Sequence, residues 1–372
     1  MARMRILFIA PAISIHTQRW VEAMCALGHT VALATQHHDE TWAFPRSLTY
    51  RVLPVSSALG YVANALSLRR FVHGFRPDIV NTHYASGYGT LSALIHYTPT
   101  LLSVWGSDVY DFPTTSPLHR SLVRWNLRRA SAIASTSEAM AAHVKRLEKS
   151  ISSVSVTPFG VDTKMFSPLA EAVSRDGNVV IGTVKTLDRK YGVDLLVKSF
   201  ARLLADPEVM EAALSDSLTL RIVGDGPERP ALEALAISER VAHRTQFIGA
   251  VSHSTVPREL RRLDIYVAAS RFESFGVAVV EASACGLPVV VSDVAGLAEV
   301  VLHGQTGLVV ERENIDALTD SIRSLVVDPG LRARLAAQGR SHVVSTYDWA
   351  DCVTRMTEAY VSARSGLTAT ME

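Results

Sequence analysis

The segment RFESFGVAVVEASACGLPVVVSD, residues 271–293, contains two carboxylates, Glu273 and Glu281, on either side of a run of small and apolar residues. An amphipathic surface helix would spread its charges along one stripe at three- and four-residue steps. This segment is instead apolar on nearly every face between the two acids. The two acids therefore need either a ligand or a structural partner.

Helix signals surround the two acids. Ser274 can cap a helix, Gly286 stands where a glycine commonly follows a helix, and Pro288 begins the next apolar run. We therefore expect a loop, a helix over residues 275–285 and then a buried strand.

The start of this expected helix suits an anion. The amides of Phe275, Gly276 and Val277 would lack partners inside the helix, and the helix dipole adds positive charge behind them. Because carboxylates accept hydrogen bonds from hydroxyls, one acid can hold a sugar and the other a ribose, with a diphosphate between them. In the alternative interpretation, Glu273 is a solvated loop acid and Glu281 is an internal ion-pair partner.

The composition is that of a globular protein with room for two domains. The 372 residues are 48% hydrophobic and 20% charged. Three widely spaced cysteines give neither a disulfide framework nor a metal-ligand cluster, which indicates a reducing compartment. The opening MARMRILFIAPAIS has the outline of a signal peptide, but it also fits a buried strand over residues 6–10 followed by a helix over residues 18–27.

The charge is unevenly distributed, although the net charge is only +1. Residues 1–165 contain 16 Lys plus Arg against 9 Asp plus Glu, and residues 166–372 contain 21 against 27. In the basic half, Arg120, Arg124 and Arg128 recur at four-residue steps on one expected helical face. This stripe predicts weak contact with an anionic membrane surface or, in the alternative, an ordinary solvated face.

Short apolar runs alternate with helical stretches along the whole chain. The runs cover residues 5–10, 30–35, 78–84, 100–106, 132–137, 179–184, 218–224, 245–250, 265–270 and 288–293. This alternation is typical of α/β proteins with parallel sheets covered by helices on both faces, and the chain needs two such sheets. The turn-rich segment 155–169 and the polar residues 174–178 put the domain boundary near residue 165.

Polar turns that contain glycine follow four strands of the second half. They are VKTLDRKYG (184–192), GDGPERP (224–230), SRFESFG (270–276) and DVAGLAEV (293–300). Because doubly wound domains bind ligands at the carboxyl ends of their strands, these turns predict a ligand site.

Together these motifs resemble those of the retaining glycosyltransferases of the GT4 family, over almost the whole chain. The similar segments are the E-x7-E arrangement in ESFGVAVVEASACGLPVVVSDVAGLAEVVLHGQTGLVV, the basic IGTVKTLDRKYGVDLLVKSF, the turn IVGDGPERPAL, ISIHTQRWVEAMCALGHTVALAT and YDWADCVTRMTEAY. The resemblance implies the GT-B fold, an α/β architecture of two facing Rossmann-like domains. It implies an acceptor-binding domain (1–165), a nucleotide-sugar-binding domain (166–346) and a C-terminal helix that crosses back to the first domain (347–372).

The resemblance also implies a role for each donor-site residue. Glu281 would bind the nucleotide ribose and Glu273 the hydroxyls of the donor sugar. Lys190 would bind the diphosphate, together with Lys185, which stands where many members have an Arg and cannot make that residue's bidentate fork. We assign catalytic roles to Glu273, Lys190 and Lys185. The other expected donor-binding residues are Glu281, Phe275, Gly276, Val277, Gly224, Asp225, Trp105 and Asp108.

The first half departs more from the family. Trp105, in LLSVWGSDVYDF, stands where many members have a His that contacts the donor sugar, and an indole cannot titrate. Asp108 can serve the sugar or the acceptor, or it can cap a turn. Loops after the first strands supply the acceptor-binding candidates, which would otherwise be ordinary loop-packing residues: His16, Arg19, Trp20, His83 and Tyr84.

The expected reaction is that of a hexosyltransferase (EC 2.4), as the resemblance implies. A sugar would move from a nucleotide diphosphate, preferably UDP, to a hydroxyl of a glycan, lipid-linked or small-molecule acceptor, with retention and by front-face attack. Fixed cations and a helix dipole can stabilise the leaving group, and the chain has no Asp-x-Asp motif, so we expect neither a metal nor another cofactor. We expect no nucleic-acid partner. The expected location is the cytoplasm, in weak contact with the inner membrane face.

Three other functions are compatible with Rossmann-like domains. A nicotinamide oxidoreductase would carry Gly-x-Gly-x-x-Gly after the first strand, and the chain lacks that motif. A GT-B nucleotide-sugar epimerase and a non-catalytic nucleotide-sugar-binding GT-B protein stay open, the second because of Trp105.

Overall fold

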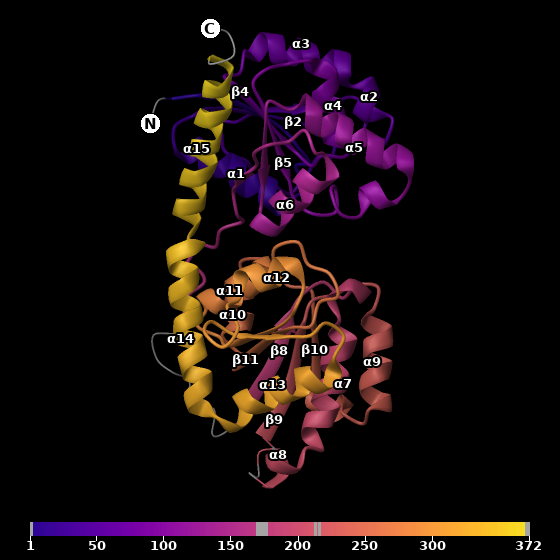
Figure 1. The fold of residues 1–372 in the computed structure, drawn as a ribbon, viewed down its shortest axis with the longest axis vertical. Coiled ribbons are helices and arrows are strands. Elements are labelled where there is room, and N and C mark those ends of the chain that lie inside the picture. Colours follow the sequence, from indigo (N-terminus) through magenta and orange to yellow (C-terminus); the bar gives the residue numbers. More distant parts are fainter. Residues whose placement is uncertain (1–2, 169–177, 212–213, 215–216, 369–372) are drawn as a thin grey trace. The chain divides into compact units, whose positions relative to one another are not determined.

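The computed structural model describes residues 3–168, 178–211, 214 and 217–368. The chain divides into two compact units, drawn in Figure 1: Met1–Phe159 with Cys352–Glu372, and Gly160–Asp351. Residues 174–177 of the expected boundary segment and residues 369–372 of the expected C-terminal helix lie outside the described residues.

The described part of the first unit contains a parallel sheet of seven strands in the order β3-β2-β1-β4-β5-β6-β7. Its strands are β1 (Arg5–Ile9), β2 (Thr30–Thr35), β3 (Thr49–Val52), β4 (Ile79–His83), β5 (Thr100–Val104), β6 (Ala132–Ser135) and β7 (Ser155–Val156). Its helices are α1 (Ile15–Ala26), α2 (Gly60–Ala63), α3 (Ala65–Phe75), α4 (Gly87–Ile95), α5 (Pro117–Arg129) and α6 (Glu138–Leu147). Every residue of β4 and β5 is buried, as expected for central strands covered by helices on both faces.

Most of the C-terminal helix α15 (Trp349–Thr368) also belongs to the first unit. Asn81 of β4 donates a side-chain hydrogen bond to the Tyr360 hydroxyl at 2.7 Å, and Arg364 forms a 3.7 Å ion pair with Asp78. Burial raises the pKa of Tyr360, so this phenol stays a neutral hydrogen-bonding group. The predicted return of the C-terminal helix to the first domain is confirmed.

The described part of the second unit contains a parallel sheet of six strands in the order β10-β9-β8-β11-β12-β13. Its strands are β8 (Val179–Val184), β9 (Leu218–Val223), β10 (Thr245–Gly249), β11 (Ile265–Ala268), β12 (Val289–Ser292) and β13 (Leu308–Val310). Its helices are α7 (Val193–Leu204), α8 (Pro207–Glu211), α9 (Arg229–Ser238), α10 (Val256–Leu260), α11 (Val277–Ala284), α12 (Ala295–Val300), α13 (Ile315–Val327) and α14 (Pro329–Thr346). The α/β class and the two parallel sheets agree with the prediction.

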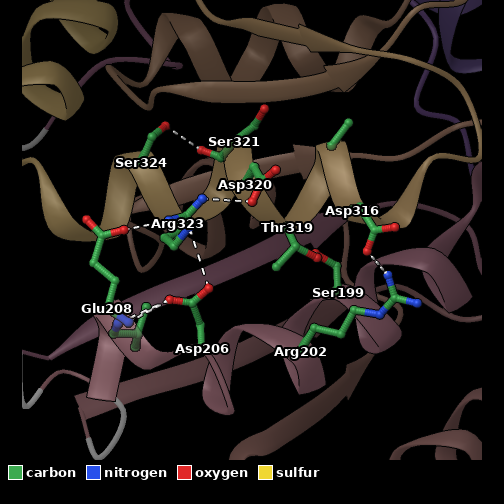
Figure 2. Close-up of polar contacts among 12 residues, drawn as sticks. Ser199, Arg202, Asp206, Glu208, Asp316, Thr319, Asp320, Ser321, Arg323 and Ser324 are labelled. Atoms are coloured by element: carbon green, nitrogen blue, oxygen red, sulfur yellow. Dashed lines mark hydrogen bonds and ion pairs between the residues drawn. The ribbon is translucent and has the colours of Figure 1, made fainter. Parts of the chain in front are cut away.

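Polar side chains join α13 to α7 and α8 in the second unit (Figure 2). Arg323 of α13 forms ion pairs with Glu208 at 2.5 Å and with Asp206 at 3.6 Å. The hydroxyls of Ser199 and Thr319, both buried, lie 3.0 Å apart between the two longer helices. These contacts fix the position of α7 along α13, because buried polar groups keep a helix pair in one register.

Two expected helices begin at other residues than predicted. The first helix starts at Ile15 rather than at residue 18, with Ser14 as its N-cap. The helix after β11 starts at Val277, and its N-cap is Gly276 with a φ of 98°, not Ser274. A Cβ atom on Gly296 would lie 2.4 Å from the carbonyl carbon of Ser274, so the preceding loop packs tightly on α12 and the helix begins later.

Candidate active site

The second sheet changes direction between β8 and β11. β8 pairs with β9 on one side and with β11 on the other. The connections from these two strands therefore leave in opposite directions, and α/β proteins bind ligands at the carboxyl ends of strands at such a point. Lys185 directly follows β8, and Glu273 lies in the loop that follows β11.

An ion pair joins these two loops. Lys185 Nζ donates a hydrogen bond to Glu273 Oε2 at 2.5 Å, and the two side chains are only 18% and 12% exposed. Burial alone would lower the pKa of Lys185, but the charges of Glu273 and the ring hydroxyls of Tyr191 and Tyr266 raise it overall. Lys185 is therefore a fixed positive charge at neutral pH.

Tyr266 connects this pair electrostatically to the second acid. It is fully buried in β11, and its hydroxyl lies 3.3 Å from the Val184 carbonyl oxygen. Burial raises the pKa of Tyr266 to about 12, Lys185 lowers it, and both Glu281 and Glu273 raise it further. The structure therefore brings together the two acids and one of the two lysines that sequence analysis singled out.

Glu281 has a partner that sequence analysis missed. The carboxylate is 8% exposed, and its Oε1 lies 3.0 Å from Nε2 of His253, in the loop after β10. The imidazole is 38% exposed and packs on Phe166 with 5.5 Å between ring centres. His253 lies in VSHSTVP, another polar turn directly after an apolar run, so the signal that located the other turns could have found it.

Backbone amides at the start of α11 lie next to the loop that contains Glu273. Helix geometry leaves the amides of Val277 and Ala278 without acceptors inside the helix, while the Val279 amide donates to the Gly276 carbonyl at 2.9 Å. The ring of Phe275 is buried and packs against Tyr347 with 5.6 Å between centres. The Phe275 side chain therefore anchors the loop, and the start of α11 provides positive potential.

A short 3₁₀ turn, Arg189–Tyr191, carries the second lysine. The centre of the Tyr191 ring lies 4.1 Å from Lys185 Nζ and 5.0 Å from Nζ of the exposed Lys190, so one aromatic ring contacts both cations. A Cβ atom on Gly192 would lie 1.9 Å from the Ala269 carbonyl oxygen, so only glycine lets this turn approach the end of β11.

Arg271 fastens the same turn to the loop that contains Glu273. Its guanidinium makes a bidentate contact with Asp194 at 2.7 and 2.8 Å and donates to the Arg189 carbonyl at 2.8 Å. Its backbone amide donates to the Lys190 carbonyl at 2.8 Å. The hydrogen bonds to Asp194 raise the pKa of Arg271. Burial raises the pKa of Asp194, but the hydrogen bonds and charge of Arg271 outweigh this effect and lower that pKa overall. Sequence analysis did not single out Arg271, because a loop arginine has no signature of its own.

The Gly-Asp-Gly-Pro turn after β9 supports the loop of Lys185. A Cβ atom on Gly224, whose φ is 135°, would lie 1.9 Å from the Lys185 carbonyl oxygen. The backbone of Asp225 accepts a hydrogen bond from the Leu187 amide at 3.0 Å, and its carboxylate pairs with Arg229 at 3.1 Å. The structure thus gives Gly224 and Asp225 a role in shaping the loop, and their contact with the donor stays a prediction.

Asp108 of the first unit organises two loops. Its carboxylate accepts hydrogen bonds from the amides of Ala85 at 2.7 Å, Trp105 at 3.1 Å and Gly106 at 2.8 Å. Burial raises the pKa of Asp108, although these hydrogen bonds oppose the shift. The sequence left two roles open for Asp108, contact with the sugar or acceptor and capping of a turn. The structure shows the carboxylate in the second role.

Trp105 lies in an aromatic cluster of the first unit and is 7% exposed. Its ring centre is 4.1 Å from that of His83, 5.0 Å from Tyr84 and 5.1 Å from Phe159. His16 stacks on Phe159 at 4.0 Å. The cluster follows from strand order, because His83 ends β4 and Trp105 follows its neighbour β5.

The acceptor-binding candidates differ in their access to solvent. Trp20 and His83 are 1% and 0% exposed, and His83 Nδ1 lies 3.0 Å from the Thr17 hydroxyl. His16, Arg19 and Tyr84 are partly exposed. The structure therefore brings His16, His83 and Tyr84 together around Trp105 and places Trp20 in the interior.

Among the residues that the structure describes, no group of three or more His, Cys, Asp or Glu side chains could hold a metal ion. In the same part of the chain, no helix is long and apolar enough to cross a membrane.

Two family profiles match the chain. The family described as "Glycosyl transferases group 1" matches residues 169–342, and the family described as "Glycosyl transferase 4-like" matches residues 5–137.

Known proteins resemble the chain over most of its length. It is 30% identical over 304 residues to D-inositol 3-phosphate glycosyltransferase of Xylanimonas cellulosilytica, which is 77% of this chain and 72% of that protein. It is 26% identical over 312 residues to glycogen synthase of Mycobacterium tuberculosis, which is 78% and 70% of the two chains.

Solved structures share the fold. Sucrose-phosphate synthase from Thermosynechococcus elongatus has a TM-score of 0.82 at 20% identity, over 97% of this chain and 99% of that one. Anabaena HepE in complex with UDP and glucose has a TM-score of 0.77 at 17% identity, over 97% and 100%.

The two Rossmann-like parallel sheets and the likeness to solved structures define the GT-B fold. The chain belongs to the GT4 family, and it is an enzyme of the hexosyltransferase type. This membership confirms the resemblance inferred from the motifs and excludes the nicotinamide oxidoreductase.

Proposed function

We propose that this enzyme transfers a hexosyl group from a nucleotide-diphosphate sugar, preferably a UDP sugar, to an acceptor hydroxyl with retention of the anomeric configuration. The observation that carries the proposal is the Lys185–Glu273 ion pair at 2.5 Å, between the loops after β8 and β11. This pair puts a cation for the diphosphate directly beside an acid for the sugar hydroxyls.

The proposed step assigns one role to each charged group. Glu281 holds the ribose, Glu273 holds the donor sugar, and Lys185 and Lys190 bind the diphosphate. The bond from the anomeric carbon to the phosphate oxygen breaks and its electron pair stays with the diphosphate, while the acceptor oxygen bonds to the same face of that carbon. The acceptor's proton passes to the departing phosphate oxygen.

Front-face attack is supported over a double displacement through Glu273. A carboxylate that accepts a hydrogen bond from Lys185 at 2.5 Å has its negative charge partly compensated and is a weaker nucleophile. Retaining enzymes that use a covalent intermediate also place two carboxylates on opposite sides of the sugar. Glu281 does not supply the second one, because in the proposed complex it holds the ribose.

Metal-independent transfer is also part of the proposal. The charge on the leaving group can be balanced by Lys185, whose pKa is raised, by Lys190 and by the start of α11. No cofactor other than the nucleotide-sugar substrate is proposed.

Two related proteins bear on the choice of base. Anabaena HepE, a structural neighbour, was solved with UDP-glucose, and a relative from Mycolicibacterium smegmatis is named a GDP-mannose-dependent mannosyltransferase. A thermal-shift panel of UDP, GDP and ADP decides between the bases. A nucleotide at about 100 times its dissociation constant adds roughly 2.7 kcal/mol of stability.

The experiment that tests the proposal measures slow hydrolysis of the donor without acceptor. We expect wild-type enzyme to release free UDP from a UDP sugar, and the Glu273→Gln variant to bind UDP but release much less. A protein that binds UDP sugars and releases no UDP under any condition would be a non-catalytic binder, and product with an inverted centre would identify an epimerase.

We also propose a cytoplasmic enzyme in weak contact with anionic membrane through the first unit. Two of the three arginines of the stripe already have an acidic partner inside the protein, because Arg124 and Arg128 both pair with the buried Glu148 at 3.0 and 3.4 Å. Arg120 is the member of the stripe for which no such pair is described. Vesicle sedimentation at low salt, with Arg120→Gln as the variant, tests this contact.

A further inference from the structure

The first sheet has its own change of direction, and a pocket lies beside it. β1 pairs with β2 on one side and with β4 on the other. Residues from the connections after β1, β2, β3 and β4 line a cavity of about 520 Å³. This volume is within the range of small-molecule sites, and the position is where α/β proteins bind ligands.

Aromatic rings form the walls of this pocket. Tyr61, Tyr84, Tyr88 and His37 all line it. The ring of Tyr88 lies 5.4 Å from that of Tyr61 and 5.6 Å from that of His37. Tyr84 has a φ of 71°, a strained conformation for a non-glycine residue that is found more often at functional sites.

Two glycines hold the Tyr61 ring in the wall. A Cβ atom on Gly87, at the start of α4, would lie 2.3 Å from the Tyr61 ring. A Cβ atom on Gly60 would lie 2.2 Å from the Val55 carbonyl oxygen. Tyr61 can therefore pack on the backbone of α4 only because both positions lack a side chain.

The tyrosine hydroxyls are engaged inside the protein. The Tyr88 hydroxyl lies 2.9 Å from His37 Nδ1 and accepts a hydrogen bond from the Gln36 amide at 3.2 Å. Burial raises the pKa values of Tyr84 and Tyr61, and the polar side chains of Ser14 and Gln36, respectively, partly oppose this effect. What faces a ligand is therefore mainly ring surface, joined by the exposed side chains of Ile13 and Ile15.

No fixed charge compensates an anion in this pocket. None of its lining residues, all of which the structure describes, is Lys, Arg, Asp or Glu. Burial lowers the pKa of His37, so this imidazole is neutral at pH 7. A phosphate placed there would lose its hydration without gaining a charged partner, at a high cost in free energy.

We infer that this pocket binds the acceptor, and that the acceptor is an uncharged hydroxyl compound with an apolar group, such as an aromatic or alkyl glycoside. The inference rests on the proposed transferase function and adds the class of acceptor to it. Several relatives are named D-inositol 3-phosphate glycosyltransferases, and a phosphorylated acceptor of that kind does not fit the chemistry of this pocket.

The experiment measures binding to the full-length protein without any donor. Phenyl and methyl glycosides of glucose, galactose and mannose, in both anomers, and L-myo-inositol 1-phosphate, which is the same compound as D-myo-inositol 3-phosphate, are titrated with ligand-observed NMR as the readout. Because the phenyl group would stack on the tyrosine rings, we expect at least one phenyl glycoside to bind about tenfold more tightly than its methyl counterpart. We expect myo-inositol 1-phosphate to bind no more tightly than the methyl glycosides.

Two variants locate the binding. Tyr61→Ala removes one wall and should abolish most of the preference for the phenyl group. Tyr97→Ala is the matched control, because Tyr97 precedes β5, at the amino ends of the strands and not at the carboxyl ends beside the pocket, and does not line the pocket. Ser86→Lys, which places a cation in the pocket, should reverse the order and favour myo-inositol 1-phosphate. Thermal unfolding checks that each variant folds. If Tyr61→Ala does not fold, Ser86→Lys alone tests where the acceptor binds.

Three outcomes would overturn the inference. No phenyl glycoside binds more tightly than its methyl counterpart, or the inositol phosphate binds wild type more tightly than every phenyl glycoside does. In the third, Tyr61→Ala and Ser86→Lys both bind the ligands as wild type does. Titration of the same samples with UDP, GDP and ADP reports on the donor site separately. If none of the three nucleotides binds, the proposed function is contradicted, and the comparison of acceptors stays intact.

Discussion

Lys185 Nζ and Glu273 Oε2 lie 2.5 Å apart, and in the proposed complex the two groups bind different parts of the donor. The lysine holds the diphosphate and the acid holds the sugar. Before the donor binds, each group therefore positions the other, since a buried cation and a buried anion are both costly when unpaired.

A double-mutant cycle should show this coupling. We expect Lys185→Met and Glu273→Gln each to lower kcat/KM strongly, and the double variant to lose less than the sum of the two losses by about 1 kcal/mol or more. Steady-state kinetics on the four proteins measures the coupling. Losses that add to within about 0.5 kcal/mol would show that the two groups act independently.

The two acids should differ in what they change. Glu281→Ala should chiefly weaken UDP binding, because ribose contacts are equal in the ground and transition states. Glu273→Ala should chiefly lower kcat, because sugar contacts can tighten as charge develops at the anomeric carbon. Titration calorimetry with UDP and single-turnover kinetics separate the two effects. Equal losses of binding with unchanged turnover in both variants would contradict the assignment.

Tyr191 should act through its ring and not through its hydroxyl. The centre of this ring lies 4.1 Å from Lys185 Nζ and 5.0 Å from Lys190 Nζ. Two cation–π contacts of about 0.5–1 kcal/mol each predict that Tyr191→Leu lowers kcat/KM by roughly fivefold to thirtyfold. Tyr191→Phe keeps the ring and is the matched control, which should retain most of the activity. If both variants lose activity equally, the hydroxyl and not the ring is what matters.

Glu148 should stabilise the first unit in a pH-dependent way. Hydrogen bonds from the hydroxyl and amide of Ser150, together with Arg124, lower the pKa of Glu148 to about 2. The stabilisation is therefore fully present above the usual carboxyl pKa and is lost as the pH falls towards 2. We expect Glu148→Gln to cost about 1–3 kcal/mol at pH 7.

The control for this measurement is Glu40→Gln, because Glu40 is an exposed acid of the same unit. Urea unfolding of the three proteins at pH 7 and pH 3 gives the comparison. The difference between wild type and Glu148→Gln should shrink at pH 3 and be absent for Glu40→Gln. A difference that stays constant with pH would show that packing, and not charge, is what the substitution changes.

Transfer should survive excess EDTA. Lysines and a helix start supply the positive charge in the proposed mechanism, so chelation removes nothing that the reaction needs. Activity is measured after dialysis against EDTA, with and without added magnesium or manganese. Abolition by the chelator and recovery with either metal would show that a cation takes part in leaving-group stabilisation.

The sequence predicted the central strands well and the edge strands poorly. All ten apolar runs correspond to strands of the described chain, but β3, β7 and β13 were missed. Each of these three lies at an edge of its sheet and is two to four residues long. An edge strand is covered less completely than a central one, so its residues need not be apolar and the pattern that marks a buried strand is weak.

The residues of the candidate site also differ in how well the sequence predicted them. Motifs and strand ends located Glu273, Glu281 and the lysines, because polar residues after buried strands stand out in the sequence. Arg271 was missed as a supporting residue, since its partner Asp194 is far away in the chain and spacing carries no information about the pair. His253 was missed although the polar turn after β10 carries the same signal as the other turns. The sequence could not decide between two roles for Asp108, because a buried carboxylate that accepts hydrogen bonds from three amides has the same sequence pattern as one that binds a sugar.

The three hydrogen bonds of Asp108 set a limit on how this enzyme could be redesigned. They tie the amide of Ala85, next to Tyr84, to the amides of Trp105 and Gly106. Pocket residues such as Tyr61 and Ile13 can be varied in a library for new acceptors, because they contribute side chains only. Asp108 should be kept in every member of that library, because its loss would shift the loops of β4 and β5 together and change the shape of the pocket whatever side chains line it.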